Sequence, residues 1–140
     1  MLRLLSPLRL RRGRGVKAIL TRDDEVLLVM HTYGPRRWEL PGGGVRRAET
    51  PLDGIRRELR EEIAVALEAT ELRALGVERR RANRRVHYFT AELAPSVAIE
   101  PDQREIARAQ WHRRGALPVR LRARVAQALD GDGHGLATAR

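Results

Sequence analysis

The sequence predicts an α/β domain of the α+β kind, in which a mixed β-sheet carries a first helix and a C-terminal helix. Two observations lead to this prediction. Hydrophobic residues make up 42% of the 140 residues, which is enough to build one buried core. Short aliphatic and β-branched runs of strand length alternate with two segments of helical period. The expected order is two or three strands, a helix, three strands and a last helix.

The first strands are predicted before residue 45. Residues 16–21 and 25–31 are aliphatic and β-branched runs separated by three polar residues, which is typical of a hairpin. Residues 38–40 form a short extended piece. We expect it to stop at the Pro-Gly-Gly-Gly of residues 41–44.

The first helix is predicted from Pro51 to about residue 66. Thr50 is a good N-cap, and proline is favoured at the first helical position. Apolar residues then recur at spacings of 3, 4, 4 and 3, at Leu52, Ile55, Leu59, Ile63 and Ala66.

The second half predicts three more strands and the last helix. Residues 72–78 and 86–93 form two strands joined by a polar hairpin at 79–85, and a further strand covers 106–112. Pro118 opens the last helix, whose buried stripe is Leu121, Val125, Ala128 and Leu129. We place the domain at residues 15–130, after a flexible basic N-terminus at 1–14 and before a disordered tail at 131–140.

Composition limits the classes of protein. There is no cysteine, which excludes disulfides, zinc–thiolate sites and a thiol nucleophile. No apolar run reaches the roughly 20 residues that a membrane span needs, so we expect no membrane partner and a cytoplasmic location. The net charge is +10, and 27 of the 28 basic residues are arginine. A basic surface attracts polyanions, but arginine-rich codon usage explains the same composition, and we expect no specific nucleic-acid partner.

Three carboxylates gather on one side of the first helix. Glu58 and Glu62 are four residues apart and lie side by side, with Glu61 one step further round. Like charges at this spacing destabilise a helix, so another charge must offset them. Arg57 and the neighbouring Arg60 can offset part of the repulsion, as on any salt-bridged helix face. A hard cation such as Mg²⁺ or Mn²⁺ would do so better.

Together with the glycines before it, this helix resembles the signature of Nudix hydrolases, G-x5-E-x7-R-E-U-x-E-E-x-G-U, where U is bulky and aliphatic. Eight of its nine specified positions match in spacing, at Gly43, Glu49, Arg57, Glu58, Leu59, Glu61, Glu62 and Val65. The ninth departs, because Ala64 stands where the pattern has glycine. We expect Ala64 to take the required conformation at modest cost if its φ is negative, so the departure concerns the end of the helix more than metal binding.

The resemblance implies an α/β/α sandwich and a metal-dependent hydrolase that cleaves a nucleoside diphosphate linked to another group X. It implies Mg²⁺ or Mn²⁺ held by Glu58 and Glu62, with Glu61 and the Gly42 backbone as further ligands. Glu58 would also orient the attacking water. Glu49 would pair with Arg57 to anchor the loop to the helix.

The resemblance also implies a carboxylate from a late loop. Glu105 is the first candidate, with Glu100 and Asp102 behind it, and a plain surface role is the alternative for each. Glu58, Glu61 and Glu105 are therefore the candidate catalytic residues. We interpret His31, His87 and His112 as strand residues rather than catalytic ones.

Candidate substrate contacts come from basic and aromatic residues. Arg36, Arg37 and the arginines of 79–85 could clamp phosphates, and Trp38 or Tyr33 could stack on a base. The alternatives are packing for the aromatic residues and chance proximity for the arginines.

The substrate itself is left open by the sequence. Features typical of family members that cleave ADP-ribose, dinucleoside polyphosphates and coenzyme A are missing, which weakens these three substrate classes without selecting another. The small size of the chain leaves nucleoside triphosphates as the default substrate. A nucleotide-type small molecule is the expected partner, and the sequence leaves a homodimer open. The alternative function is a catalytically silent module that binds nucleotide or nucleic acid through its basic surface.

Overall fold

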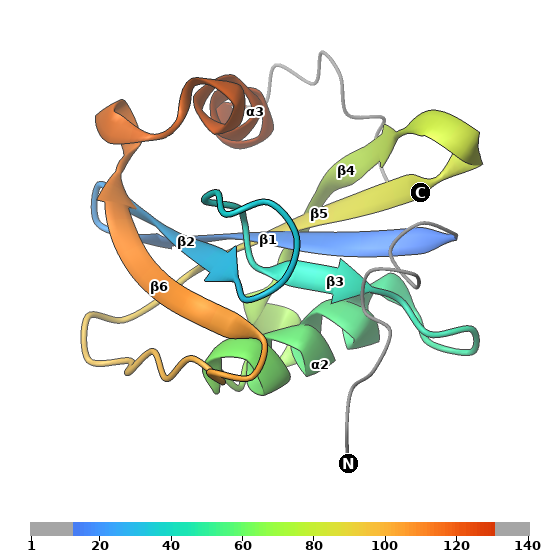
Figure 1. Ribbon diagram of the computed structural model, residues 1–140, viewed down its shortest axis with the longest axis horizontal. Coiled ribbons are helices and arrows are strands. Elements are labelled where there is room, and N and C mark those ends of the chain that lie inside the picture. The colour runs from blue at the N-terminus through green and yellow to red at the C-terminus, as the bar shows by residue number, and fades with distance from the viewer. Residues whose placement is uncertain (1–12, 131–140) are drawn as a thin grey trace.

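The computed structural model describes residues 13–130 and shows a six-stranded sheet between two helices (Figure 1). The strands are β1 (Arg14–Arg22), β2 (Glu25–His31), β3 (Gly42–Gly44), β4 (Arg73–Arg79), β5 (Arg85–Glu92) and β6 (Ile106–Arg113). The helices are α2 (Pro51–Ile63) and α3 (Val119–Asp130), and short 3₁₀ turns lie at Ala69–Glu71, Arg81–Asn83 and Arg114–Ala116. This is the predicted α+β sandwich with a mixed sheet.

The sheet runs in the order β4-β5-β1-β2-β6, and β3 also pairs with β1. The β1–β5 pair is parallel, whereas the other strand pairs are antiparallel. One edge of β1 is shared, because β2 pairs with its last residues and β3 with its first ones. The sheet therefore splits along this edge of β1, where β2 continues it at one end of the strand and β3 at the other.

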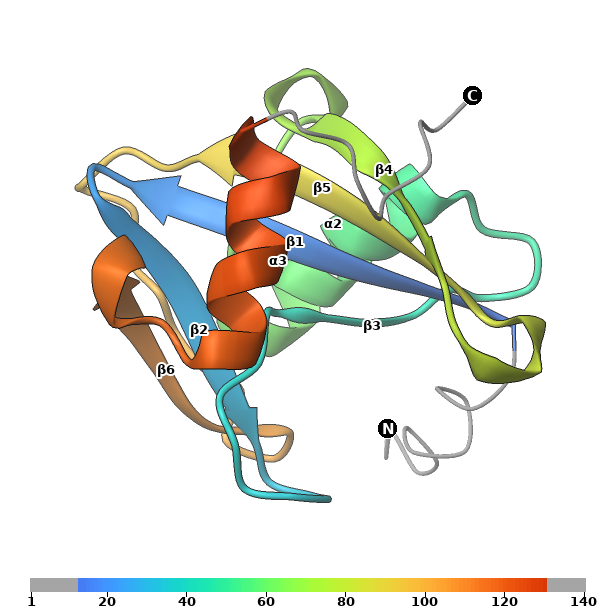
Figure 2. The ribbon, with the colours of Figure 1, turned by 90° about the horizontal axis from the view of Figure 1, so that it is seen from above.

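Each face of the sheet is covered by one helix (Figure 2). Alternate residues of β1 point to opposite faces, as a strand requires. Val16 and Leu20 pack in the core under α2 with Leu59, whereas Ile19 packs under α3 with Val125. Because β1 and β2 are buried on both faces of the sheet, their sequences are nearly continuous apolar runs.

The glycine segment differs from the prediction. Gly42–Gly44 forms strand β3, which we expected to be the stop of a strand at residues 38–40. Of that expected strand, Glu39 makes only an isolated bridge with Val29. The close approach to β1 explains the glycine at position 42, because a Cβ there would collide with the carbonyl oxygen of Val16.

The first helix is shorter than predicted. It ends at Ile63, and Ala64 caps it in the left-handed conformation with φ of 57° and ψ of 33°. The negative φ under which we expected a modest cost at Ala64 is therefore not present. The signature glycine position is a left-handed cap here, which alanine occupies at a steric cost.

The remaining boundaries shift by one or two residues. Strand β1 begins at Arg14, inside the segment that we expected to be flexible, and α3 begins at Val119 rather than Pro118. Leu121, Val125 and Ala128 are buried as predicted, with Leu129 partly buried. Residues 1–12 and the expected tail at 131–140 lie outside the described residues. None of the described helices is long and apolar enough to cross a membrane.

Candidate functional site

The acidic side of α2 lies against the glycine strand. Thr50 caps the helix, because its hydroxyl oxygen accepts a hydrogen bond from the Asp53 amide at 3.1 Å. A Cβ on Gly43 would lie 2.7 Å from the Cδ atom of the Glu58 carboxylate. Glycine at position 43 therefore lets the backbone approach this carboxylate closely.

Glu62 is the deepest carboxylate of the site, with 2% of its surface exposed. Its Oε1 atom accepts a hydrogen bond from the Gly42 amide at 2.9 Å. Its Oε2 atom lies 3.2 Å from Nε2 of His31. The other ring nitrogen of His31, Nδ1, lies 3.1 Å from Oε2 of Glu39. A buried imidazole thus links two carboxylates.

His31 is held in its charged form by these partners. Burial alone would lower its pKa, but the hydrogen bonds to Glu39 and Glu62 outweigh burial and raise the pKa to about 9. The hydrogen bond from His31 in turn lowers the pKa of Glu39 to about 2. His31 is a residue of β2, as the sequence predicted, but its contacts with Glu39 and Glu62 were not predicted. No local motif marked it, because its partner Glu62 is 31 residues away.

Arg57 organises the other half of the site. It donates two hydrogen bonds of 2.8 Å to the two carboxylate oxygens of Glu49, and a third of 2.9 Å to the Gly44 carbonyl. Its Nη1 atom also lies 2.9 Å from Glu58 and 3.2 Å from Glu61. The predicted Glu49–Arg57 pair is therefore present. Arg57 lowers the pKa of Glu49 to about 2.

The three helix carboxylates differ in burial. Glu58 and Glu62 are buried, whereas the Glu61 side chain is 30% exposed and also pairs with Arg46 at 3.7 Å. Among the described residues, no group of three or more His, Asp or Glu side chains is arranged to hold a metal ion by itself. Mg²⁺ does not need such a cage, because it commonly takes one or two carboxylates, water and substrate phosphate. The buried oxygen donors of Glu58 and Glu62 fit that requirement.

The late loop joins the same region through its backbone. The amides of Glu100 and Asp102 donate to the carbonyls of Ile63 and Glu62, at 3.0 Å and 2.8 Å. The Asp102 carboxylate pairs with exposed Arg104, and Glu100 is exposed.

Glu105 is the late-loop carboxylate whose charge acts on Tyr33. Its backbone carbonyl accepts a hydrogen bond from the Thr32 amide at 2.9 Å, directly after β2. Burial, together with the charges of Glu62, Glu105 and Glu58, raises the pKa of Tyr33. The Tyr33 phenol therefore lies within the field of both the helix carboxylates and Glu105.

The predicted substrate contacts separate in space. Arg36 and Arg37 are both exposed, but Arg37 also lies 3.4 Å from the Glu39 carboxylate. Trp38 instead packs edge-on against His112, with ring centroids 4.6 Å apart. It is a partly buried neighbour of the core under α3, so packing accounts for this aromatic residue.

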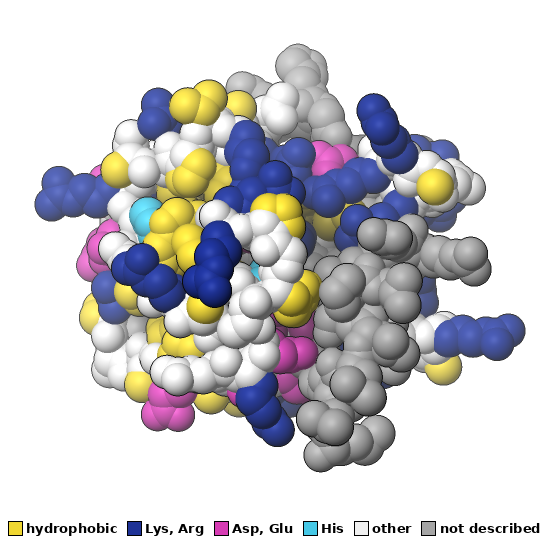
Figure 3. All heavy atoms as spheres, in the orientation of Figure 1, with side chains coloured by type: hydrophobic (Ala, Val, Ile, Leu, Met, Phe, Trp, Pro, Cys, Tyr) yellow, Lys and Arg dark blue, Asp and Glu magenta, His cyan; other side chains and the backbone are white. Residues whose placement is uncertain are grey.

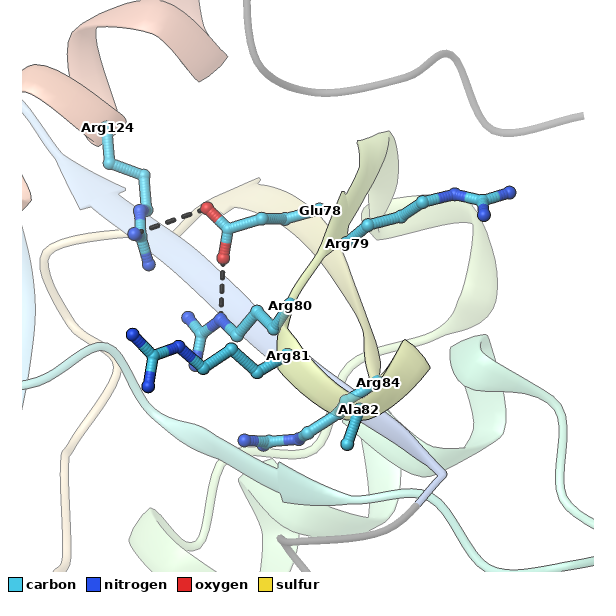
Figure 4. A pocket seen from close by; sticks show the side chains of 7 residues that line it. All are labelled: Glu78, Arg79, Arg80, Arg81, Ala82, Arg84 and Arg124. Carbon is cyan, nitrogen blue, oxygen red and sulfur yellow. Dashed lines mark hydrogen bonds and ion pairs between the residues drawn. The ribbon is translucent and has the colours of Figure 1, made fainter.

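A wide hollow of about 690 Å³ opens between α3 and the hairpin of β4 and β5. It is lined by Glu78, Arg79, Arg80, Arg81, Ala82, Arg84 and Arg124 (Figure 4). Basic side chains gather over this part of the surface, below α3 and beside the hairpin (Figure 3). We call this feature the arginine hollow.

Comparison with known proteins identifies one family. The family model described as "NUDIX domain" matches residues 11–130. A MutT-like protein of Streptomyces ambofaciens is 30% identical over 123 residues, which cover 85% of this chain and 78% of that protein. An RNA pyrophosphohydrolase of Halorhodospira halophila is 42% identical over 66 residues, but these cover only 47% of this chain and 35% of that protein.

A solved structure of a protein from this family is also similar to the chain. A MutT NUDIX hydrolase from Burkholderia pseudomallei superimposes with a TM-score of 0.65 and 26% identity, covering 76% of this chain and 86% of that one.

Proposed function

The chain belongs to the Nudix hydrolase family, and on that premise we propose that it hydrolyses the diphosphate linkage of a nucleoside diphosphate joined to another group X, using Mg²⁺ or Mn²⁺. The family match and the relatives with pyrophosphohydrolase names make it a pyrophosphohydrolase. The single observation that carries the metal assignment is the burial of Glu58 and Glu62 against the glycine strand. Two buried carboxylates on adjacent helical turns repel each other; Arg57 and His31 offset part of that repulsion, and a hard cation would offset more of it.

The metal-binding residues would be Glu58 and Glu62, with Glu61 and the Gly42 backbone as outer contacts. Bound Mg²⁺ or Mn²⁺ would neutralise phosphate oxygens and polarise the linkage toward attack. Glu58 would accept the proton of the attacking water, since the backbone at Gly43 approaches it without a side chain in the way. The partly exposed Glu61 would contact the ion through water.

Other residues would position this machinery. Arg57 ties the glycine loop to α2 through Glu49 and the Gly44 carbonyl, and it holds Glu58 at 2.9 Å. His31 holds Glu62 through its Nε2 atom, 3.2 Å from Oε2 of that carboxylate. Their role is to fix carboxylate directions, and neither needs to touch the substrate.

Glu105 is proposed as the additional carboxylate of the late loop. Its influence on Tyr33, which the helix carboxylates share, favours it over exposed Glu100 and over Asp102, which pairs with Arg104. Arg37 is the better placed of the two predicted arginines for phosphate contact, because it already lies beside Glu39.

The test is a panel of nucleoside diphosphate derivatives and nucleoside triphosphates with Mg²⁺ or Mn²⁺, scored for released phosphate products. Glu58→Gln keeps the side-chain shape and removes the charge, so kcat should fall by about 10²- to 10⁴-fold at saturating metal. Glu92→Gln, an exposed glutamate at the end of β5, is the matched control and should keep the parent kcat. A Glu58→Gln variant with nearly full kcat would contradict the role of Glu58. A parent without turnover on any compound would favour a silent binding module.

We also propose that the protein is cytoplasmic and has no specific nucleic-acid partner, and that the chain is compatible with a homodimer.

A further inference from the structure

The arginine hollow carries more positive charge than its own acid can balance. Five arginines and one glutamate line it. Three hairpin arginines, Arg80, Arg81 and Arg84, extend to the same side beneath Arg124 of α3, while Arg79 points the other way (Figure 4). Four guanidinium groups therefore converge from two elements that are distant in sequence.

The acid of the hollow is already engaged. Glu78 lies 2.7 Å from Arg80 and 3.2 Å from Arg124. The Tyr88 hydroxyl donates to Glu78 at 3.2 Å and accepts hydrogen bonds from Arg80 at 3.2 Å and Arg124 at 2.9 Å. Glu78 and Tyr88 thus satisfy two of the four convergent arginines and fix their directions.

The other two arginines have no such partner. Within the described residues, no carboxylate pairs with Arg81 or Arg84. The Nε atom of Arg84 is buried without a hydrogen-bond partner. Arg84 lies over the backbone of β1, where a Cβ on Gly15 would come within 3.1 Å of its Nη2 atom. Burial and the nearby charge of Arg80 lower the pKa of Arg84. A buried hydrogen-bond donor beside a group of like charge destabilises the fold unless an anion accepts its hydrogen bond and offsets the charge.

Lys17 of β1 lies between the strand that borders the carboxylate site and the strand that borders the hollow. On β1, Lys17 is paired with Gly42 of β3 on one side and with Tyr88 of β5 on the other. Two strand spacings, about 10 Å in total, therefore separate Gly42 from Tyr88. Lys17 Nζ donates to the Leu40 carbonyl at 3.1 Å. Burial lowers the pKa of Lys17, and the charges of Glu62 and Arg84 both act on its ammonium group.

We infer that the arginine hollow binds a phosphate group of the substrate that lies outside the cleaved linkage, through Arg81 and Arg84. Planar guanidinium groups recognise phosphate by paired hydrogen bonds, and a cluster of them selects dianionic groups over neutral ones. The preferred substrates are then nucleotide derivatives that carry at least one phosphate besides the two of the cleaved diphosphate. This substrate class rests on the proposed hydrolase function, whereas the anion site does not.

The anion site is tested without turnover. Inorganic triphosphate is titrated into the full chain by calorimetry in EDTA and low salt, where the carboxylates repel it and do not contribute affinity. Arg84→Gln and the exposed Arg81→Gln should each weaken binding by about tenfold or more. Arg73→Gln, an exposed arginine of β4 that does not line the hollow, should change it less than about twofold. No binding by the parent, or equal losses in Arg73→Gln and Arg84→Gln, would overturn the site.

The substrate class is tested by kinetics. The parent should show kcat/KM at least about tenfold higher for a nucleoside triphosphate than for a nucleoside diphosphate sugar, and Arg81→Gln should reduce that ratio through KM. Turnover with no preference for the additional phosphates would overturn the substrate class while leaving the hydrolase function standing. No turnover of any compound would defeat both the function and the substrate class, and the titration would still decide the anion site.

Discussion

The cap of α2 offers a quantitative test of the folded structure. Ala64 is exposed and has φ of 57°, with its amide hydrogen-bonded to the carbonyls of Arg60 and Leu59. An alanine in this conformation costs about 1–2 kcal/mol more than a glycine. The glycine variant loses roughly 0.5–1 kcal/mol of this gain, because its unfolded chain has greater conformational entropy. Ala64→Gly should therefore stabilise the protein by about 0.5–1 kcal/mol.

Thermal and urea unfolding measure this difference. For a domain of this size, the expected rise in Tm is about 2–3 °C. The matched control is Ala66→Gly, two residues on, since Ala66 is also exposed but is not among the residues with positive φ. The control should lower Tm slightly, because only the entropy cost of glycine remains. A lower Tm for Ala64→Gly, or equal shifts of the same sign in both variants, would refute the left-handed cap.

Three other predictions address the site. Increasing Mn²⁺ should raise the Tm of the parent by mass action and leave Glu62→Gln nearly unchanged, and equal shifts would remove Glu62 from the metal site. Glu58→Gln should lose kcat by about 10²- to 10⁴-fold while Glu92→Gln keeps it, as measured on the substrate panel. The pKa of Glu49 is lowered to about 2 by Arg57, so the pair stabilises the fold above the ordinary carboxyl pKa and is lost as pH falls below it. Glu49→Gln should thus cost about 2 kcal/mol near neutral pH in urea unfolding, and a gap to the parent that does not shrink toward about pH 3 would contradict that sign.

Features that depend on neighbours along the chain were predictable. The helical period of about 100° per residue places Glu58 beside Glu62 wherever the helix packs. The signature spacing from Glu49 to Arg57 anticipated their ion pair, which the structure contains at 2.8 Å. Strand β2 was predicted with its observed bounds because a polar turn and an aliphatic run mark both of its ends.

Predictions from the local sequence pattern differ from the structure where contacts with other elements determine the backbone conformation. A Pro-Gly-Gly-Gly run is usually a turn, but Gly42–Gly44 forms a strand because β1 offers it an unpaired edge. At Ala64 the helix-favouring side chain is overruled, since the chain must leave α2 there to place Val65 in the core. Neither outcome is visible in the propensities of the residues concerned.

The sequence by itself determined the fold class, the family and the carboxylate face of α2, because each depends on spacing within one segment. Only the tertiary structure decided that His31 and Glu39 join Glu62, and that Arg124 of α3 reaches the hairpin of β4 and β5. These groups are brought together by strand register and by helix packing across the sheet. Such contacts between segments distant in sequence depend on how the whole core closes, and no local period encodes them.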